Sequence, residues 1–108
     1  QKRRKSMNEK IHNKEVDDLF DAILSLSSRE ECYNFFEDVC TINEILSLSQ
    51  RYEVAGMLRD KQTYLDISEK TGASTATISR VNRSLNYGND GYATVWKHLK
   101  EKKDGGQE

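Results

Sequence analysis

Apolar side chains recur every three or four residues through most of this chain, and that spacing predicts amphipathic helices. Such stripes lie within residues 13–25, 28–40, 41–58 and 92–99. Capping boxes, in which Ser or Thr is followed three residues later by Glu, mark two helix starts, at Ser28 and at Thr41. The sequence contains no proline, the residue that breaks helix interiors. The pattern predicts long helices on both sides of a shorter central unit.

That central unit, residues 63–85, has the pattern of a helix-turn-helix. Gly72 lies where the first helix ends and a positive φ angle is favoured, and Ser74 can cap the second helix. The second helix has one apolar face, formed by Ile78, Val81 and Leu85. In DNA-binding proteins the second helix of this unit enters the major groove. With three helices before the unit and one after it, we expect an all-α fold of six helices.

The polar face of the second helix carries side chains suited to nucleic acid. Residues 70–89 contain three basic side chains and no acidic one. Short hydroxyl side chains can approach base edges, and arginine pairs with phosphate or guanine. The predicted DNA-binding residues are Lys70, Ser74, Thr75, Ala76, Thr77, Ser79, Arg80, Asn82 and Arg83. Arg80 and Arg83 would bind phosphate or bases, and Lys70 would attract the duplex. The alternative interpretation is a solvated helix surface without a partner.

The net charge of −1 argues against a nucleic-acid binder when it is taken alone. The charges are unevenly distributed, however: residues 15–53 hold ten acidic and two basic side chains, whereas basic residues gather in residues 1–14, around the helix-turn-helix and near the C-terminus. A chain polarised in this way can present a basic face to phosphates. The acidic scaffold keeps a second hypothesis open, in which the helix-turn-helix contacts a protein partner such as the transcription machinery.

The length of 108 residues fits one domain, although only 35% of the residues are hydrophobic. We expect a flexible basic tail at 1–12, a single helical domain at 13–101 and a flexible tail at 102–108. Residues 1–6 are either an arm that contacts DNA or a non-native extension before Met7. The helices of residues 13–40 carry more apolar surface than two helices can cover, which favours a homodimer over a compact monomer.

Several other protein classes lack support in the sequence. No run of about 18 apolar residues and no signal-peptide core is present, so we expect a cytoplasmic protein that does not associate with membranes. No nucleophile–base pair, glycine-rich phosphate loop or metal-ligand set is present, which argues against an enzyme and against a metal site. Cys32 and Cys40 are about 12 Å apart along one predicted helix, which is too far for a disulfide within that helix. Both lie in its apolar stripe, so we expect buried free thiols.

The stretch Gly72-Ala-Ser-Thr-Ala-Thr-Ile-Ser-Arg80 resembles the turn and recognition-helix start of the Trp repressor family. The order of elements matches as well, and the likeness extends over residues 16–99. The bacterial TrpR-like branch is the most similar, because Leu85-Asn-Tyr-Gly-Asn-Asp90 also fits its pattern. The resemblance implies an intertwined homodimer that represses transcription by binding double-stranded DNA. In the Trp repressor, itself an example of this motif, most base contacts pass through water.

The resemblance also implies a candidate effector pocket. In the tryptophan-sensing member, two arginines sandwich the indole ring and hydroxyl side chains help to line the site. The positions that resemble this set are Thr41, Arg51, Thr77, Arg80 and Ser84. The family's glycine after the second arginine is Val81 here, and its side chain would intrude where the ring lies. We therefore expect no cofactor and no tryptophan corepressor, and we leave another small-molecule effector open. Arg80 would then contact DNA, and Arg51 would pair with Glu44 or Glu53.

Overall fold

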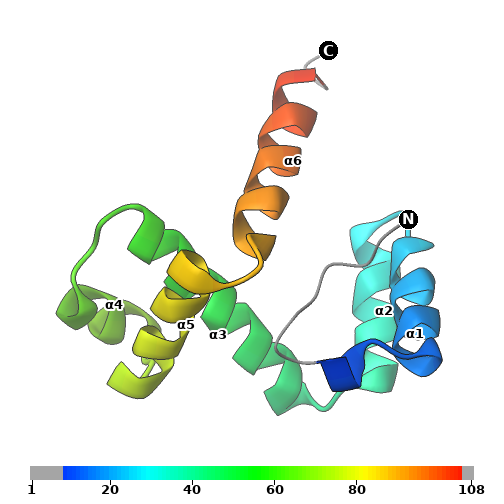
Figure 1. Ribbon diagram of the computed structural model, residues 1–108, viewed down its shortest axis with the longest axis horizontal. Helices are drawn as coiled ribbons and strands as arrows, with labels where there is room; N and C mark the ends of the chain where they lie inside the picture. Colours follow the sequence, from blue (N-terminus) through cyan, green and yellow to red (C-terminus); the bar gives the residue numbers. More distant parts are fainter. Residues whose placement is uncertain (1–8, 106–108) are drawn as a thin grey trace. The chain divides into compact units, whose positions relative to one another are not determined.

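The computed structural model describes residues 9–105, and the regular structure in this range is entirely helical (Figure 1). A 3-10 turn at Glu9–Ile11 precedes six α-helices: α1 (Lys14–Leu24), α2 (Arg29–Val39), α3 (Ile42–Arg59), α4 (Tyr64–Thr71), α5 (Thr75–Tyr87) and α6 (Gly91–Gly105). The predicted all-α chain of six helices is confirmed. None of the helices described is both long and apolar enough to cross a membrane.

Internal packing divides the chain into two compact units, with the boundary between Ile45 and Leu46. The first unit contains α1, α2 and the first turn of α3, and the second contains the rest of α3 with α4, α5 and α6. The boundary therefore lies inside a continuous helix. The packing within one chain gives two units and does not test whether they form one domain. The single domain expected over residues 13–101 therefore remains a prediction.

The second unit has a small core between α3 and the helix-turn-helix. Its buried residues, which we call the core cluster, are Val54, Ala55, Ile67, Ala73, Ile78 and Val81, each at most 2% exposed. Ile67 comes from α4, and Ile78 and Val81 come from α5 at the predicted spacing of one apolar helix face. α4 and α5 therefore rest together on α3, and the side of α5 that faces the core is fixed.

Aromatic side chains join α6 to α3. Tyr52 of α3 lies with its ring centroid 6.4 Å from that of Tyr92 and 6.3 Å from that of Trp96, and the rings of Tyr92 and Trp96 are 5.8 Å apart. The guanidinium carbon of Arg59 lies 4.3 Å from the centroid of the Trp96 ring, within the range of a cation–π contact. Because Tyr92 and Trp96 both lie in the first half of α6, this cluster fixes the start of that helix.

The first unit contains no buried side chain among its described residues. Val16, Ile23, Phe35 and Phe36 are half-buried, whereas Leu24 is 80% exposed. Other large apolar side chains of this unit that remain exposed are Ile11, Leu19, Phe20, Tyr33, Val39 and Ile42. The apolar stripes predicted from the sequence are therefore present, but one chain by itself does not cover them.

The cysteines correct one expectation. Both are free thiols, but Cys32 is exposed and Cys40 is half-buried, so neither is the buried thiol that the sequence predicted. Cys32 lies on the predicted apolar stripe of α2, at a position that the described residues leave exposed.

The helix starts follow the predicted capping signals, with one difference. At α3, the Thr41 hydroxyl accepts from the Glu44 N–H at 3.1 Å and the Glu44 carboxylate accepts from the Thr41 N–H at 2.8 Å, which is a complete capping box. At α2, the Ser28 hydroxyl accepts from the Glu31 N–H at 3.1 Å. The Glu31 carboxylate, however, reaches back one residue further, to the N–H of Ser27 at 2.8 Å.

The boundaries of both predicted tails also differ from the structure. α6 continues to Gly105, so residues 102–105 are helical although the sequence placed them in the C-terminal tail. Lysines at 102 and 103 favour this extension because cations in the last turn interact well with the helix dipole. Within the predicted tail 1–12, Glu9–Ile11 form a 3-10 turn. The basic segment 1–6, with residues 7 and 8, and residues 106–108 lie outside the described range.

Replacing Ile67 with alanine should lower the free energy of unfolding by about 2–5 kcal/mol, because the fully buried side chain leaves a cavity in the core cluster. Urea denaturation followed by circular dichroism, at one fixed protein concentration, measures this loss. Leu65 lies two positions earlier on the same helix and is 67% exposed, and its replacement by alanine should change the unfolding free energy by about 0.5 kcal/mol or less. Equal effects of the two substitutions would contradict the assigned core.

Candidate nucleic-acid interface

The turn between α4 and α5 has the geometry that the sequence predicted. Gly72 ends α4 with a φ angle of +76°, in the left-handed region that glycine adopts without strain. Its N–H donates to the Ser68 carbonyl oxygen at 2.8 Å. The Ser74 hydroxyl accepts from the Thr77 N–H at 3.1 Å and caps α5. The start of α5 is therefore held in place before any ligand is considered.

A further set of hydrogen bonds around Thr71 stabilises this turn. The Thr71 hydroxyl donates to the Ile67 carbonyl oxygen at 2.7 Å and accepts from the Ala73 N–H at 3.1 Å. The Gln50 side-chain amide of α3 donates to the Thr71 carbonyl oxygen at 3.1 Å. No local sequence pattern marks Thr71 or Gln50, because their contact spans 21 positions.

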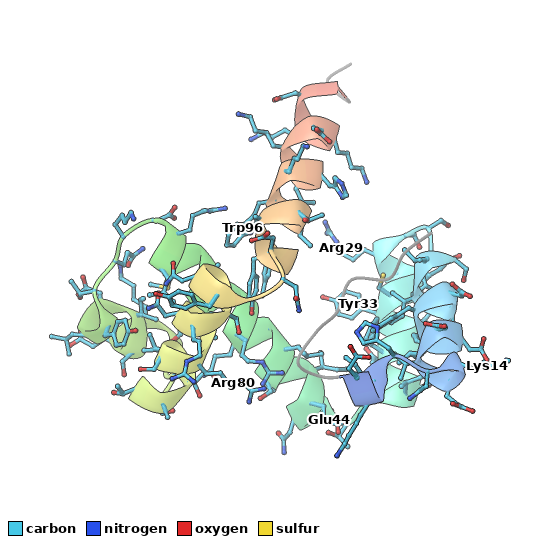
Figure 2. The ribbon with its side chains drawn as sticks, viewed as in Figure 1. Lys14, Arg29, Tyr33, Glu44, Arg80 and Trp96 are labelled. Atoms are coloured by element: carbon cyan, nitrogen blue, oxygen red, sulfur yellow. The ribbon has the colours of Figure 1, made fainter. Side chains whose placement is uncertain are left out.

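The outward face of α5 is polar and basic. Five of the predicted residues on this helix are exposed: Thr75, Ala76, Ser79, Arg80 and Arg83. Arg80 extends from α5 in Figure 2. Neither Arg80 nor Arg83 forms an ion pair within residues 9–105. Their charges are therefore available to an anionic partner, since no carboxylate of the described chain neutralises them.

Two of the predicted residues lie on the flanks of α5 instead. Thr77 and Asn82 are half-buried, and the Asn82 carbonyl and side-chain oxygens accept from the Asn86 amide at 3.0 and 3.3 Å. Asn82 also lines a cavity of about 520 Å³ that Arg59 and Trp96 border as well. Asn82 is therefore less accessible to a ligand on the outward face than Arg80 and Arg83 are. The cavity itself was not predicted from the sequence.

Lys70 lies in the last turn of α4, beside the turn itself, and is exposed. Its ammonium group donates to the side-chain oxygen of Gln62 at 3.1 Å. Because glutamine is neutral, this hydrogen bond orients Lys70 without cancelling its charge. The predicted role in attracting a duplex is therefore compatible with its position.

One exposed aromatic residue on α5 was not among the residues predicted from the sequence. Tyr87, the last residue of α5, is 86% exposed. It follows Arg83 by four positions and Arg80 by seven, so all three share one face of the helix. Counting this spacing onward from the two arginines would have identified Tyr87 from the sequence.

The positions of the candidate effector pocket come from both units of the chain. Thr41 belongs to the first unit, whereas the other four lie in the second. Arg51 is half-buried and forms no ion pair within the described residues, so the predicted pairing with Glu44 or Glu53 is wrong. The Glu44 carboxylate instead caps α3 through the Thr41 N–H. Thr77, Arg80 and Ser84 share α5.

Val81 occupies the position at which the family resemblance leads one to expect glycine. Its side chain is 2% exposed and belongs to the core cluster. The valine therefore fills interior space next to Arg80.

The structure groups no metal-ligand set among residues 9–105. In this range, no three histidine, cysteine or acidic side chains lie close enough together to hold a metal ion.

Comparison with known proteins places this geometry in a family. Residues 14–100 match the family model of the Trp repressor protein. The protein YerC of Bacillus subtilis (strain 168), described as uncharacterised, is 61% identical over 93 residues, which cover 86% of this chain and 89% of that protein. The family model spans the helix-turn-helix and the helices on either side of it.

Solved structures show the same relationship. A TrpR-like protein from Eubacterium eligens ATCC 27750 is 71% identical, with a TM-score of 0.83 over 86% of this chain and 96% of that one. A candidate Trp repressor from Staphylococcus aureus is 53% identical, with a TM-score of 0.84 over 89% of this chain and 96% of that one. This chain therefore belongs to the Trp repressor family, within its TrpR-like members.

Proposed function

We propose that this protein is a sequence-specific regulator of transcription, a repressor, that binds double-stranded DNA as a homodimer through α4 and α5. The observation that carries the proposal is the outward face of α5, on which two arginines have no ion-pair partner among the described residues. The core cluster fixes the opposite face against α3, so the arginine-bearing face is the one left for a ligand.

The chemistry of this face suits DNA better than it suits other anions. Arg80 and Arg83 can pair with phosphates or bind guanine through two hydrogen bonds. The side chains before them on α5 are short, so the helix can approach base edges closely, directly or through water. The residues we assign to base contacts are Thr75, Ala76 and Ser79, with Ser74 and Thr77 at the helix start. Lys70 would raise the association rate by attracting phosphates.

A second copy of the chain is the partner that the first unit requires. This unit has no buried side chain among its described residues, yet it exposes large apolar side chains on both α1 and α2. Exposed apolar surface of this extent is unfavourable in water, and association covers it. A two-fold dimer would present two α5 helices to two half-sites about 34–36 Å apart, as helix-turn-helix dimers do.

Tryptophan is not part of the proposed mechanism. The buried Val81 side chain occupies space that glycine would leave open beside Arg80, and Arg80 extends outward on the face that we assign to DNA. We propose that the protein binds DNA without a tryptophan corepressor. We also propose that it acts in the cytoplasm as a binding protein and not as an enzyme.

The experiment that tests DNA binding is selection of bound duplexes from a random or genomic pool, followed by fluorescence anisotropy on the selected sequence. We expect a palindromic site, because two copies of α5 would read two equivalent half-sites. Retention of no duplex even at low salt would refute the proposal. It would favour the alternative, a helix-turn-helix that contacts a protein partner.

Replacing Arg83 with alanine should weaken binding to the selected duplex and to unrelated duplexes by a similar factor. The slope of log K against log salt concentration should also become less steep by about one, because one phosphate contact is lost. Anisotropy titrations over several salt concentrations measure both quantities. Lys14, which already pairs with Asp18 at 2.8 Å on α1, is the matched control, and Lys14→Ala should change neither the affinity nor the slope.

Thr75→Ala and Ser79→Ala should instead alter the base preference of the protein, which a repeated selection of bound duplexes measures.

Replacing Phe20 with glutamate should dissociate the dimer, because it introduces a charge into the apolar face of α1 that a second copy would cover. We expect the dissociation constant to rise at least about tenfold, given the cost of burying an unpaired charge. Analytical ultracentrifugation over a range of protein concentrations measures this. Leu65→Glu, on the exposed side of α4 in the second unit, is the control and should remain dimeric. A monomeric wild-type protein would rule out the homodimer.

A further inference from the structure

One hydrogen bond joins the scaffold helix α3 directly to the end of α4. The side-chain amide of Gln50 donates to the Thr71 carbonyl oxygen at 3.1 Å. Thr71 is the last residue of α4, and the carbonyl groups of a final helical turn have no partner within their own helix. Gln50 therefore caps the C-terminus of α4 from a neighbouring helix.

The other polar groups around this carbonyl are also paired. The Thr71 hydroxyl bonds to the Ile67 carbonyl oxygen and to the Ala73 N–H, and the Gly72 N–H bonds to the Ser68 carbonyl oxygen. Gln50 and Thr71 are both half-buried, so water competes less for their hydrogen bond than it does at the surface. The whole turn that precedes α5 is thus connected to α3 through Gln50.

This bond differs in kind from the core contacts between the same helices. The core cluster is apolar, and apolar attraction depends on buried area and hardly on angle. Side chains in such a contact can repack after a small rotation of one helix against another. A hydrogen bond weakens steeply when its angle falls, so it resists that rotation. Ser74, the N-cap of α5, directly follows the bonded turn, so a rotation there would change the direction of α5.

We propose that Gln50 is a positioning residue that sets the angle at which α5 is presented, and with it the half-site spacing that the dimer accepts. This inference rests on the proposed DNA-binding function. In a two-fold assembly, any rotation of α5 against its own α3 is repeated in the partner. A small change in angle therefore moves the two recognition helices apart, or toward each other, by twice the single displacement.

The test uses the full-length protein and two substitutions at Gln50. Gln50→Met keeps a long unbranched side chain but removes the donor, whereas Gln50→Glu places a carboxylate beside the Thr71 carbonyl oxygen. Ser49→Ala, at the exposed neighbouring position on α3, is the matched control. Each protein is titrated against duplexes that carry the two selected half-sites at the selected separation, or one or two base pairs closer or further apart. Circular dichroism at the assay temperature verifies that each variant is folded.

We expect Gln50→Met to bind the best-spaced duplex about five- to tenfold more weakly, because DNA binding must then fix the angle of α5 at a cost comparable to the worth of the lost hydrogen bond. The preference for that spacing over its neighbours should fall by a similar factor, because the angle of α5 is no longer fixed. Gln50→Glu should show a larger effect in the same direction. Ser49→Ala should match the wild-type protein in both affinity and spacing preference.

Other outcomes would overturn the inference. If affinity falls equally at all spacings, or if a variant cannot be folded at any temperature, the Gln50 bond serves stability alone. Wild-type spacing preference in both variants would likewise exclude a positioning role. Failure of the wild-type protein to bind any duplex would remove the proposed function itself and this inference with it. That failure is visible before any variant is made, so the two cases are distinguishable.

Discussion

The packing of α4 and α5 on Val54 and Ala55 of α3 is the contact on which the rest of the structure depends. Ile78 and Val81 are drawn into it, and a helix with 3.6 residues per turn must then turn positions 79, 80 and 83 away from α3. The exposed arginines are thus a consequence of the buried residues. The tight turn at Gly72 joins the two helices whose side chains meet in this contact.

Features that depend on neighbours in the sequence could be predicted, and those that depend on distant residues could not. The six helices, the capping residue Ser74 and the left-handed Gly72 all follow from local spacing, and all three are found. The bond from Gln50 to Thr71 crosses 21 positions, and no periodicity marks it. The partial burial of Asn82 was also not predicted. A helical wheel gives the direction of a side chain, but it does not show which side chains the neighbouring helices α3 and α6 cover.

The acidic residues of the first half of the chain explain how a protein with a net charge of −1 can still present unpaired cations. Ion pairs would form if the acidic and basic side chains alternated along one helix. Around Arg80 and Arg83 they do not alternate, because residues 70–89 hold no acidic side chain. In the described residues the ion pairs found are Lys14 with Asp18 and Arg59 with Asp60, both away from α5. Net charge is therefore a poor guide to this chain, whereas the position of each charge along it is informative.

The two units distribute a small number of apolar residues in opposite ways, and this links assembly to the proposed function. The second unit buries its apolar residues within the chain and so holds a defined surface by itself. The first unit leaves Phe20 and its neighbours uncovered, and in the proposed homodimer a second copy covers them. If the partner is a second copy, each chain holds one complete α5 surface for DNA by itself. The second such surface, which a two-part site needs, is then supplied only in the dimer. Affinity for a two-part site would then depend on protein concentration as well as on the residues of α5.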